Sequence, residues 1–186
     1  MVDFENWKIQ QELVIGIADK NPETYIQAIA YFNPFDDIGE LGTQIELSIS
    51  DSLVDVDVHI SKEEVIPDFE LRQTSTGKLS KKKMSKSRFN ELYQDHICSS
   101  IIRVSRELFA YLPLEKARVN AIGKVINSST GHLEEQPLLS VIMIPGTINS
   151  LNLDTIDPSD SMQNFVHNMK FSKVNGFSPV DKVELK

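Results

Sequence analysis

A cluster of basic residues near the middle of the chain is the first group that could do chemistry. Residues 76–88 read TGKLSKKKMSKSR and hold six bases and no acid. We predict that this segment runs from a loop into the start of a long helix, where free backbone N–H groups and the helix dipole attract phosphate. The segment therefore predicts a binding site for a phosphate group or an acidic partner. Its basic residues are Lys78, Lys81, Lys82, Lys83, Lys86 and Arg88.

Two other interpretations of this basic segment stay open. In the first, its bases form ion pairs with the acidic N-terminal third of the chain or are simply solvated. In the second, the predicted order of one helix, three strands and a basic helix start resembles a double-stranded-RNA-binding domain, whose lysines contact phosphates across a groove. The run of small residues expected in that helix is missing, and the segment has no aromatic residue to stack on single-stranded bases.

Four carboxylates on neighbouring predicted strands form a second candidate site. Asp55 and Asp57 share one face of a strand because side chains alternate along it, and Asp68 and Glu70 lie on the next predicted strand. This layout resembles that of metal-dependent restriction-type nucleases, in which Mg²⁺ suits such oxygen ligands. That family has a Glu-x-Lys triplet, whereas Arg72 stands at the lysine position here and does not readily give up a proton. A nuclease is the alternative function, and magnesium is expected only under it.

His132 is the histidine best placed for general acid–base chemistry. It stands in a predicted polar loop that leads into a central strand, and Glu134 and Glu135 follow it closely. Adjacent residues of a strand point to opposite faces, which argues against a working pair. His59 is predicted on the wet face of the strand that carries Asp55. The spacing of the histidines matches no metal-binding motif, so no metal site is expected from them.

The single cysteine and the missing motifs exclude several classes of protein. Cys98 lies beside an apolar position of the predicted long helix, which predicts a buried structural thiol. His96 is two residues away and therefore on a different side of that helix. One cysteine excludes an intramolecular disulfide and a cysteine-cluster metal site. The sequence contains no glycine-rich nucleotide-binding motif and no Gly-x-Ser-x-Gly elbow, so we expect no cofactor.

The charge of the 186-residue chain is divided unevenly. The formal net charge of −8 separates into −13 over residues 1–70, +7 over residues 71–106 and −2 over residues 107–186. A negative total argues against non-specific coating of nucleic acid, but it leaves room for one local basic site. The sequence has no apolar run of about 18 residues that would predict a membrane span and no signal-peptide pattern at its start. A cytoplasmic location is expected.

The hydrophobic pattern predicts one α+β domain over residues 1–186, with the element order ααβββαββα. We expect a mixed, mostly antiparallel sheet with one long helix packed across it, a helical N-terminal arm over 1–35 and an extended tail over 170–186. The predicted helices cover 4–17, 22–33, 85–112 and 157–169. The predicted strands cover 45–49, 54–60, 65–73, 117–125 and 138–144, with a turn at 51–52 and a polar loop at 127–137.

Several blocks of the sequence resemble an uncharacterised bacterial protein family. They include NPFDD (33–37), TGKLSKKKMSK (76–86), TGHLEEQPLLSV (130–141) and DPSDSMQNFVHNMKF (157–171), and together they span most of the chain. The resemblance implies a bacterial cytoplasmic protein and carries no activity, cofactor or catalytic residue with it. The absence of catalytic motifs therefore favours a non-catalytic binding module for an acidic protein surface, nucleic acid or phosphate group over an enzyme.

Overall fold

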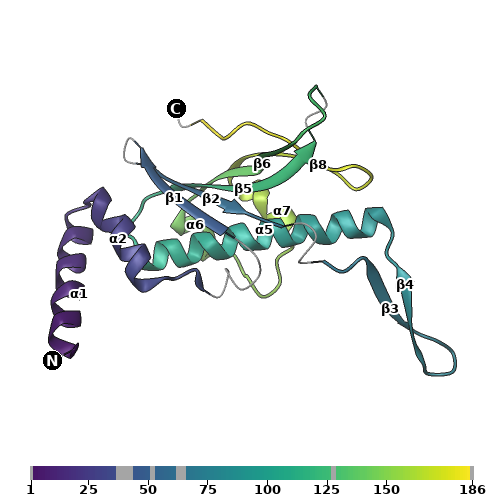
Figure 1. Cartoon of the computed structure of the whole chain (residues 1–186), viewed down its shortest axis with the longest axis horizontal. Coiled ribbons are helices and arrows are strands. Elements are labelled where there is room, and N and C mark those ends of the chain that lie inside the picture. Colours follow the sequence, from purple (N-terminus) through teal and green to yellow (C-terminus); the bar gives the residue numbers. More distant parts are fainter. Residues whose placement is uncertain (1, 37–43, 51–52, 62–65, 127–128, 185–186) are drawn as a thin grey trace.

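A mixed six-stranded sheet with one long helix across it forms the centre of the molecule (Figure 1). The computed structural model describes residues 2–36, 44–50, 53–61, 66–126 and 129–184. The helices are α1 (Val2–Ala18), α2 (Pro22–Phe32), α5 (Lys86–Tyr111), α6 (Pro145–Ser150), α7 (Pro158–Ser161) and the 3-10 turn η1 (Met162–Asn164). The strands are β1 (Gln44–Ser50), β2 (Leu53–His59), β3 (Phe69–Gln73), β4 (Leu79–Lys83), β5 (Ala117–Ile126), β6 (Leu133–Met143), β7 (Val166–Ser172) and β8 (Gly176–Ser178).

The sheet has the strand order β1-β2-β5-β6-β7-β8. Only β2 and β5 run parallel, and the other neighbouring strands are antiparallel. A parallel pair needs a long crossover connection, and α5 supplies it. The predicted fold class is therefore confirmed, including the hairpin of the first two strands; its turn at 51–52 lies outside the described residues.

Helix α5 follows the predicted pattern closely. The side chain of Ser85 caps its first turn by accepting a hydrogen bond from the backbone N–H of Arg88 at 3.3 Å. Apolar residues spaced three or four apart put one face of the helix against the sheet, and Ile97, Ile101 and Leu108 are fully buried there. The facing side of the sheet is equally apolar, with buried Val54, Val56, Val58, Val119, Ala121, Leu139 and Val141.

Helices α1 and α2 form an arm at one end of the molecule (Figure 1). Asn21 caps α2 by accepting a hydrogen bond from the backbone N–H of Glu23 at 2.9 Å, and Pro22 occupies the first helical position, as predicted. The two helices cross closely at Gly16, where an added Cβ would lie 2.3 Å from the Thr24 hydroxyl oxygen. Glycine at this position is therefore what lets α1 pack on α2.

The basic segment differs from the prediction of a loop. Residues 79–83 form strand β4, which pairs with β3 in a separate two-stranded sheet that projects from the start of α5 (Figure 1). The strand expected over 65–73 begins only at Phe69. The turn between β3 and β4 contains Gly77, whose φ of +80° is a conformation that glycine adopts without strain. Lys83 and Lys81 of β4 lie opposite Phe69 and Leu71 of β3 on one face of the hairpin, and the prediction missed this pairing across the turn.

The C-terminal third departs most from the prediction. In place of the helix expected over 157–169, the chain forms the short helix α7 and the 3-10 turn η1. It then continues as the strand β7, which pairs with β6. The Asp157 cap is confirmed, since its carboxylate accepts from the backbone N–H of Ser159 and Asp160 at 2.9 Å. The polar loop expected over 127–137 is also wrong in part, because β6 begins at Leu133 and lengthens the β5–β6 hairpin. Among the described helices, none is long and apolar enough to cross a membrane.

Candidate functional site

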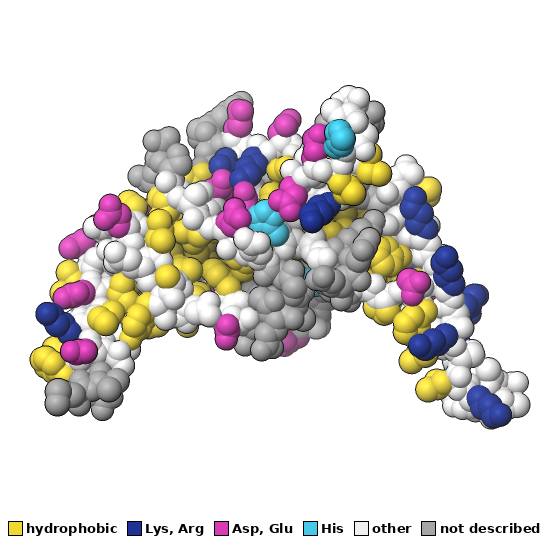
Figure 2. All heavy atoms as spheres, in the orientation of Figure 1, with side chains coloured by type: hydrophobic (Ala, Val, Ile, Leu, Met, Phe, Trp, Pro, Cys, Tyr) yellow, Lys and Arg dark blue, Asp and Glu magenta, His cyan; other side chains and the backbone are white. Residues whose placement is uncertain are grey.

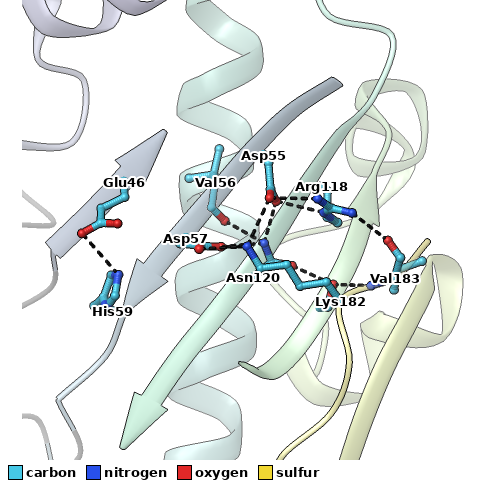
Figure 3. Close-up of polar contacts among 10 residues, drawn as sticks. Glu46, Asp55, Val56, Asp57, His59, Arg118, Asn120, Lys182 and Val183 are labelled. Carbon is cyan, nitrogen blue, oxygen red and sulfur yellow. Dashed lines mark hydrogen bonds and ion pairs between the residues drawn. The ribbon is translucent and has the colours of Figure 1, made fainter. Parts of the chain in front are cut away.

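Asp55 is the centre of a polar cluster on the sheet face that lies opposite α5 (Figure 3). Arg118 donates two hydrogen bonds to its carboxylate, from Nε at 3.0 Å and from Nη2 at 2.9 Å. Asn120 Nδ2 donates at 2.7 Å and Lys182 Nζ at 3.1 Å. The Asp55 side chain thus accepts from three residues, and two of them carry positive charge.

Asp57 and Ser140 extend this cluster. The Asp57 carboxylate accepts from Lys182 Nζ at 2.7 and 2.9 Å and from Asn120 Nδ2 at 2.7 Å. On the other side of Asn120, its Oδ1 accepts from the Ser140 hydroxyl at 2.7 Å, and the Ser140 oxygen accepts from the Val183 backbone N–H at 2.9 Å. The result is one continuous network from β2 through β5 and β6 to the C-terminal tail.

Strand register explains why these side chains meet. In the parallel β2–β5 pair Asp55 lies opposite Arg118 and Asp57 opposite Asn120, and in the β5–β6 pair Asn120 lies opposite Ser140. The prediction that Asp55 and Asp57 share a face is confirmed. The expectation that this face is exposed to solvent is wrong for Asp55. This residue is only 8% exposed, because the tail over 179–184 crosses this face of the sheet.

Electrostatics favours the ionised form of Asp55. Burial alone would raise the pKa of its carboxyl, but hydrogen bonds from Arg118, Asn120 and Lys182 outweigh that effect and lower the pKa. The pKa of Arg118 is raised, chiefly by its hydrogen bonds to Asp55. Two carboxylates, of Asp55 and Asp57, therefore face two cations at this cluster. Hydrogen-bond donors already occupy the carboxylate oxygens that a metal ion would need. This arrangement is suited to holding the tail on the sheet.

A pH dependence of stability follows from the lowered pKa of Asp55. A carboxyl with a depressed pKa in the folded state stabilises the fold fully above its ordinary value of 3.8, and this contribution is lost as the pH falls through the lower folded value. We expect Asp55→Asn to lower the free energy of unfolding most at pH 7 and progressively less as the pH falls below 3.8. Urea unfolding over a pH series from 7 downward measures this change. A penalty that stays constant down to the lowest pH would contradict the charge network.

The structure does not bring the four predicted carboxylates together. Asp68 and Glu70 lie on the β3–β4 hairpin, which is a separate sheet, while Asp55 and Asp57 lie within the central one. Glu70 pairs with Arg72 at 3.4 Å on its own strand. No group of three or more His, Cys, Asp or Glu side chains within the described part of the chain is placed to hold a metal ion. The magnesium site expected for the nuclease alternative is therefore not formed by these residues.

His132 and Glu134 lie at the end of the β5–β6 hairpin. The His132 side chain is exposed, and Glu134 accepts hydrogen bonds from Thr130 Oγ1 at 3.2 Å and from Gln136 Nε2 at 3.0 Å. His132 lies just before the start of β6 and is exposed, so water reaches the imidazole freely. His59 instead has carboxylates on both sides, with Glu46 at 3.7 Å and Glu135 at 3.5 Å.

Cys98 is a structural thiol, as predicted. It is completely buried in α5, and burial raises the pKa of its thiol to about 12. A thiol with that pKa is almost wholly protonated at neutral pH and is a poor nucleophile. Burial also lowers the pKa of His96, which keeps this imidazole neutral. Neither residue presents reactive chemistry at the surface.

The β3–β4 hairpin and the first turn of α5, residues 69–88, form what we call the basic arm. Figure 2 shows Lys and Arg side chains following one another along this projecting segment. Every residue of β4 is exposed. Lys81 leans over the ring of Phe69, with Nζ 4.4 Å from its centroid, which is a cation–π contact. The lysines are therefore presented along one ribbon and are not spread over the body of the molecule.

Few bases of the basic arm form ion pairs with residues that the structure describes. Arg72 pairs with Glu70 at 3.4 Å and Arg88 with Glu91 at 3.6 Å. The remaining basic side chains form no ion pair with any described residue, including those of the acidic N-terminal third; they are Lys78, Lys81, Lys82, Lys83 and Lys86. Pairing with the described acids of residues 1–70 is thereby excluded as the reason for the basic segment.

Sequence reasoning missed the partners of the two buried-face carboxylates. Arg118, Asn120 and Lys182 were not singled out, although Asn120 and Ser140 were visible as lone polar residues inside otherwise apolar strands. A polar side chain at such a position must find a hydrogen-bond partner, and this signal could have pointed to the network. Lys182 had no such signal, because an isolated lysine in a tail is ordinary surface composition.

The fold and the site together define an α+β chain with a projecting basic arm and a charge-paired network under its C-terminal tail. Comparison of the sequence with protein-family models, and of the chain with curated proteins and solved structures, finds no match. The function must therefore be argued from the geometry of this chain alone.

Proposed function

We propose that this chain is a non-catalytic binding module that holds an acidic or phosphate-bearing partner through its basic arm. The observation that supports this most is the row of five lysines that are without an ion pair to any described residue. These lysines stabilise the fold through no ion pair with a described residue, and Lys86 in the first turn of α5 opposes the helix dipole. A partner that supplies negative charge would pair with the lysines and offset this unfavourable contact with the dipole.

The basic arm carries the charge of the basic segment away from the body of the molecule. Residues 69–88 contain seven bases and one acid, a net charge of +6, against −8 for the whole chain. Each strand of the hairpin has five residues and spans about 17 Å at 3.3 Å per residue. That length is about twice the 8 Å screening length at physiological salt, so the tip of the arm is shielded from the negative body.

The helix start contributes less than the hairpin. Ser85 already accepts the hydrogen bond from the Arg88 backbone N–H, so one free donor of the helix N-terminus is occupied. Lys81, Lys82 and Lys83 lie on β4, and Lys78 lies just before this strand. We therefore place the main contact on the hairpin, with Lys86 and Arg88 at its foot.

Replacing Lys81, Lys82 and Lys83 with alanine tests the proposal. The wild-type chain should bind fluorescent poly-L-glutamate or a duplex oligonucleotide with an affinity that falls as salt rises, and the triple variant should lose most of that binding. The fold should change little, because substitutions of exposed residues usually cost less than about 0.5 kcal/mol. Fluorescence anisotropy over a salt series measures the binding.

A matched control variant distinguishes loss of a specific binding site from loss of positive charge in general. The variant with Lys116, Lys124 and Lys170 replaced by alanine removes the same charge from exposed positions elsewhere. This control should keep most of the wild-type affinity. Equal losses in the two variants would show that only net charge matters, and unchanged binding in the first variant would refute a basic-arm site.

A further inference from the structure

The N-terminal end of the molecule exposes an apolar helix face that nothing in the described chain covers. Phe4, Trp7, Val14 and Ile15 fall on one side of α1, and they are between 54% and 69% exposed. The rings of Phe4 and Trp7 stack with their centroids 5.9 Å apart. Only the opposite side of α1 packs on α2, through the buried Leu13. Large exposed apolar residues that gather on one side of a helix are typical of an interaction surface.

The same end of the molecule is acidic. We call α1, α2 and the turn between them the acidic arm, because its exposed carboxylates outnumber its two lysines, Lys8 and Lys20. The exposed carboxylates of this arm and its connecting turn are Glu5, Glu12, Asp19 and Glu23. None of them forms an ion pair with a residue that the structure describes. The acidic arm therefore combines unpaired negative charge with a free apolar stripe.

The basic arm has the complementary combination. Leu71 and Leu79 are 59% and 71% exposed, and the strand register puts them on the same hairpin face as Lys81 and Lys83. A phosphate polymer would satisfy the lysines but would leave these leucines in water. An acidic helix with an apolar stripe would cover both kinds of side chain.

We propose that the acidic arm of one copy of this chain docks on the basic arm of a second copy. This inference rests on the proposed function, because it names the acidic partner that the basic arm binds. The two arms lie at opposite ends of the molecule (Figures 1 and 2), so they do not meet within one copy. Helix α1 has 17 residues and is about 25 Å long, enough to cover a ribbon of about 17 Å.

The geometry of this contact determines the kind of assembly. The two surfaces differ, so after the first contact the pair keeps one free basic arm, on the first copy, and one free acidic arm, on the second. Such a head-to-tail interface continues into a chain of copies or closes as a ring. It also covers both exposed apolar surfaces with a single interface, which binding of nucleic acid does not.

Mixing two variants with different defects tests the inference. One is the Lys81, Lys82 and Lys83 triple alanine variant, and the other is Trp7→Ala/Ile15→Ala on the acidic arm. Wild-type chain should form concentration-dependent oligomers in analytical ultracentrifugation at low salt. Each variant alone should associate about thirtyfold more weakly, as expected for loss of an interface hot spot. An equimolar mixture should form a dimer and nothing larger, because the intact acidic arm of one meets the intact basic arm of the other.

The outcomes separate this inference from the proposed function. A monomeric wild-type chain that still binds poly-L-glutamate through the basic arm would overturn self-assembly and leave the function standing. Binding of the duplex oligonucleotide alone, without self-association, would overturn it in favour of a nucleic-acid partner. A chain that neither associates nor binds either probe would overturn both. Unchanged association of both variants would place the interface elsewhere and overturn the inference as well.

Discussion

Replacing Asp55 with alanine is expected to lower the free energy of unfolding by about 3–5 kcal/mol, the range observed when one partner of a buried ion pair is removed. The Asp55 carboxylate accepts from Arg118, Asn120 and Lys182, so its loss leaves Arg118 Nε and Nη2 without their acceptor and leaves Asp57 as the remaining carboxylate partner of Asn120 and Lys182. The Asp55 side chain is almost completely buried, and water cannot easily replace it. Urea unfolding at pH 7 measures the change.

Two further variants make this result interpretable. Asp154 is exposed, and its replacement by alanine should cost less than about 0.5 kcal/mol. The double variant Asp55→Ala/Arg118→Ala should be less destabilised than the sum of its single variants, because residues in direct contact couple. A cost near that of Asp154→Ala, or strict additivity with Arg118→Ala, would contradict the network.

Ending the chain at Val180 is expected to have the second largest effect, about 3 kcal/mol of unfolding free energy. Truncation removes Lys182, which donates to Asp55 and to Asp57, together with the Val183 N–H that donates to Ser140. Two carboxylates would then share the single cation Arg118, and hydrogen bonds to charged groups contribute about 1.5–3 kcal/mol each. Thermal unfolding followed by circular dichroism measures the loss.

A shorter truncation is the matched control for this prediction. A chain that ends at Glu184 keeps Lys182 and Val183 and should unfold like the full chain. Within the full chain, Lys182→Met should give part of the Val180 truncation effect, because it removes the cation and keeps the length of the side chain. If the chain ending at Val180 is as stable as the full chain, the tail does not hold the sheet face as the structure indicates.

The local sequence predicted correctly those helices and strands for which all local features favour the same structure. Helix α5 has apolar residues at three- and four-residue spacing over its whole length, a serine cap and a proline just beyond its end, and all three agree. The last helix had equally good start signals in Asp157 and Pro158, but the residues that follow form the strand β7. Pairing with β6 decided between helix and strand, and this tertiary preference is not visible in the local sequence.

The sequence predicted several of the charged residues that belong to the candidate sites, but it did not predict how the fold arranges them. Alternation along β2 was enough to place Asp55 and Asp57 on one face. Lys182 lies 127 positions from Asp55, so only the folded chain could show that the tail supplies the second cation. Likewise, the charge of the basic segment was plain from its sequence, while its projection as a hairpin depended on pairing between β3 and β4.

The two charged regions therefore have different roles in this account. The carboxylates of β2 are matched by cations and hold the tail, so they stabilise the fold. The lysines of the basic arm lack such partners among the described residues and are available for binding. The net charge of −8 is compatible with both, because the +6 of residues 69–88 is one local part of a sum that is negative overall.

Residue-resolved NMR during a titration with poly-L-glutamate tests the central claim most directly. The Trp7→Ala/Ile15→Ala variant suits this measurement, because its basic arm is intact and its self-association is weakened. The account predicts that amide shifts change over residues 69–88 and that the changes shrink as salt is added. Shifts centred on Asp55, Asp57 and the tail, with the basic arm unaffected, would contradict it.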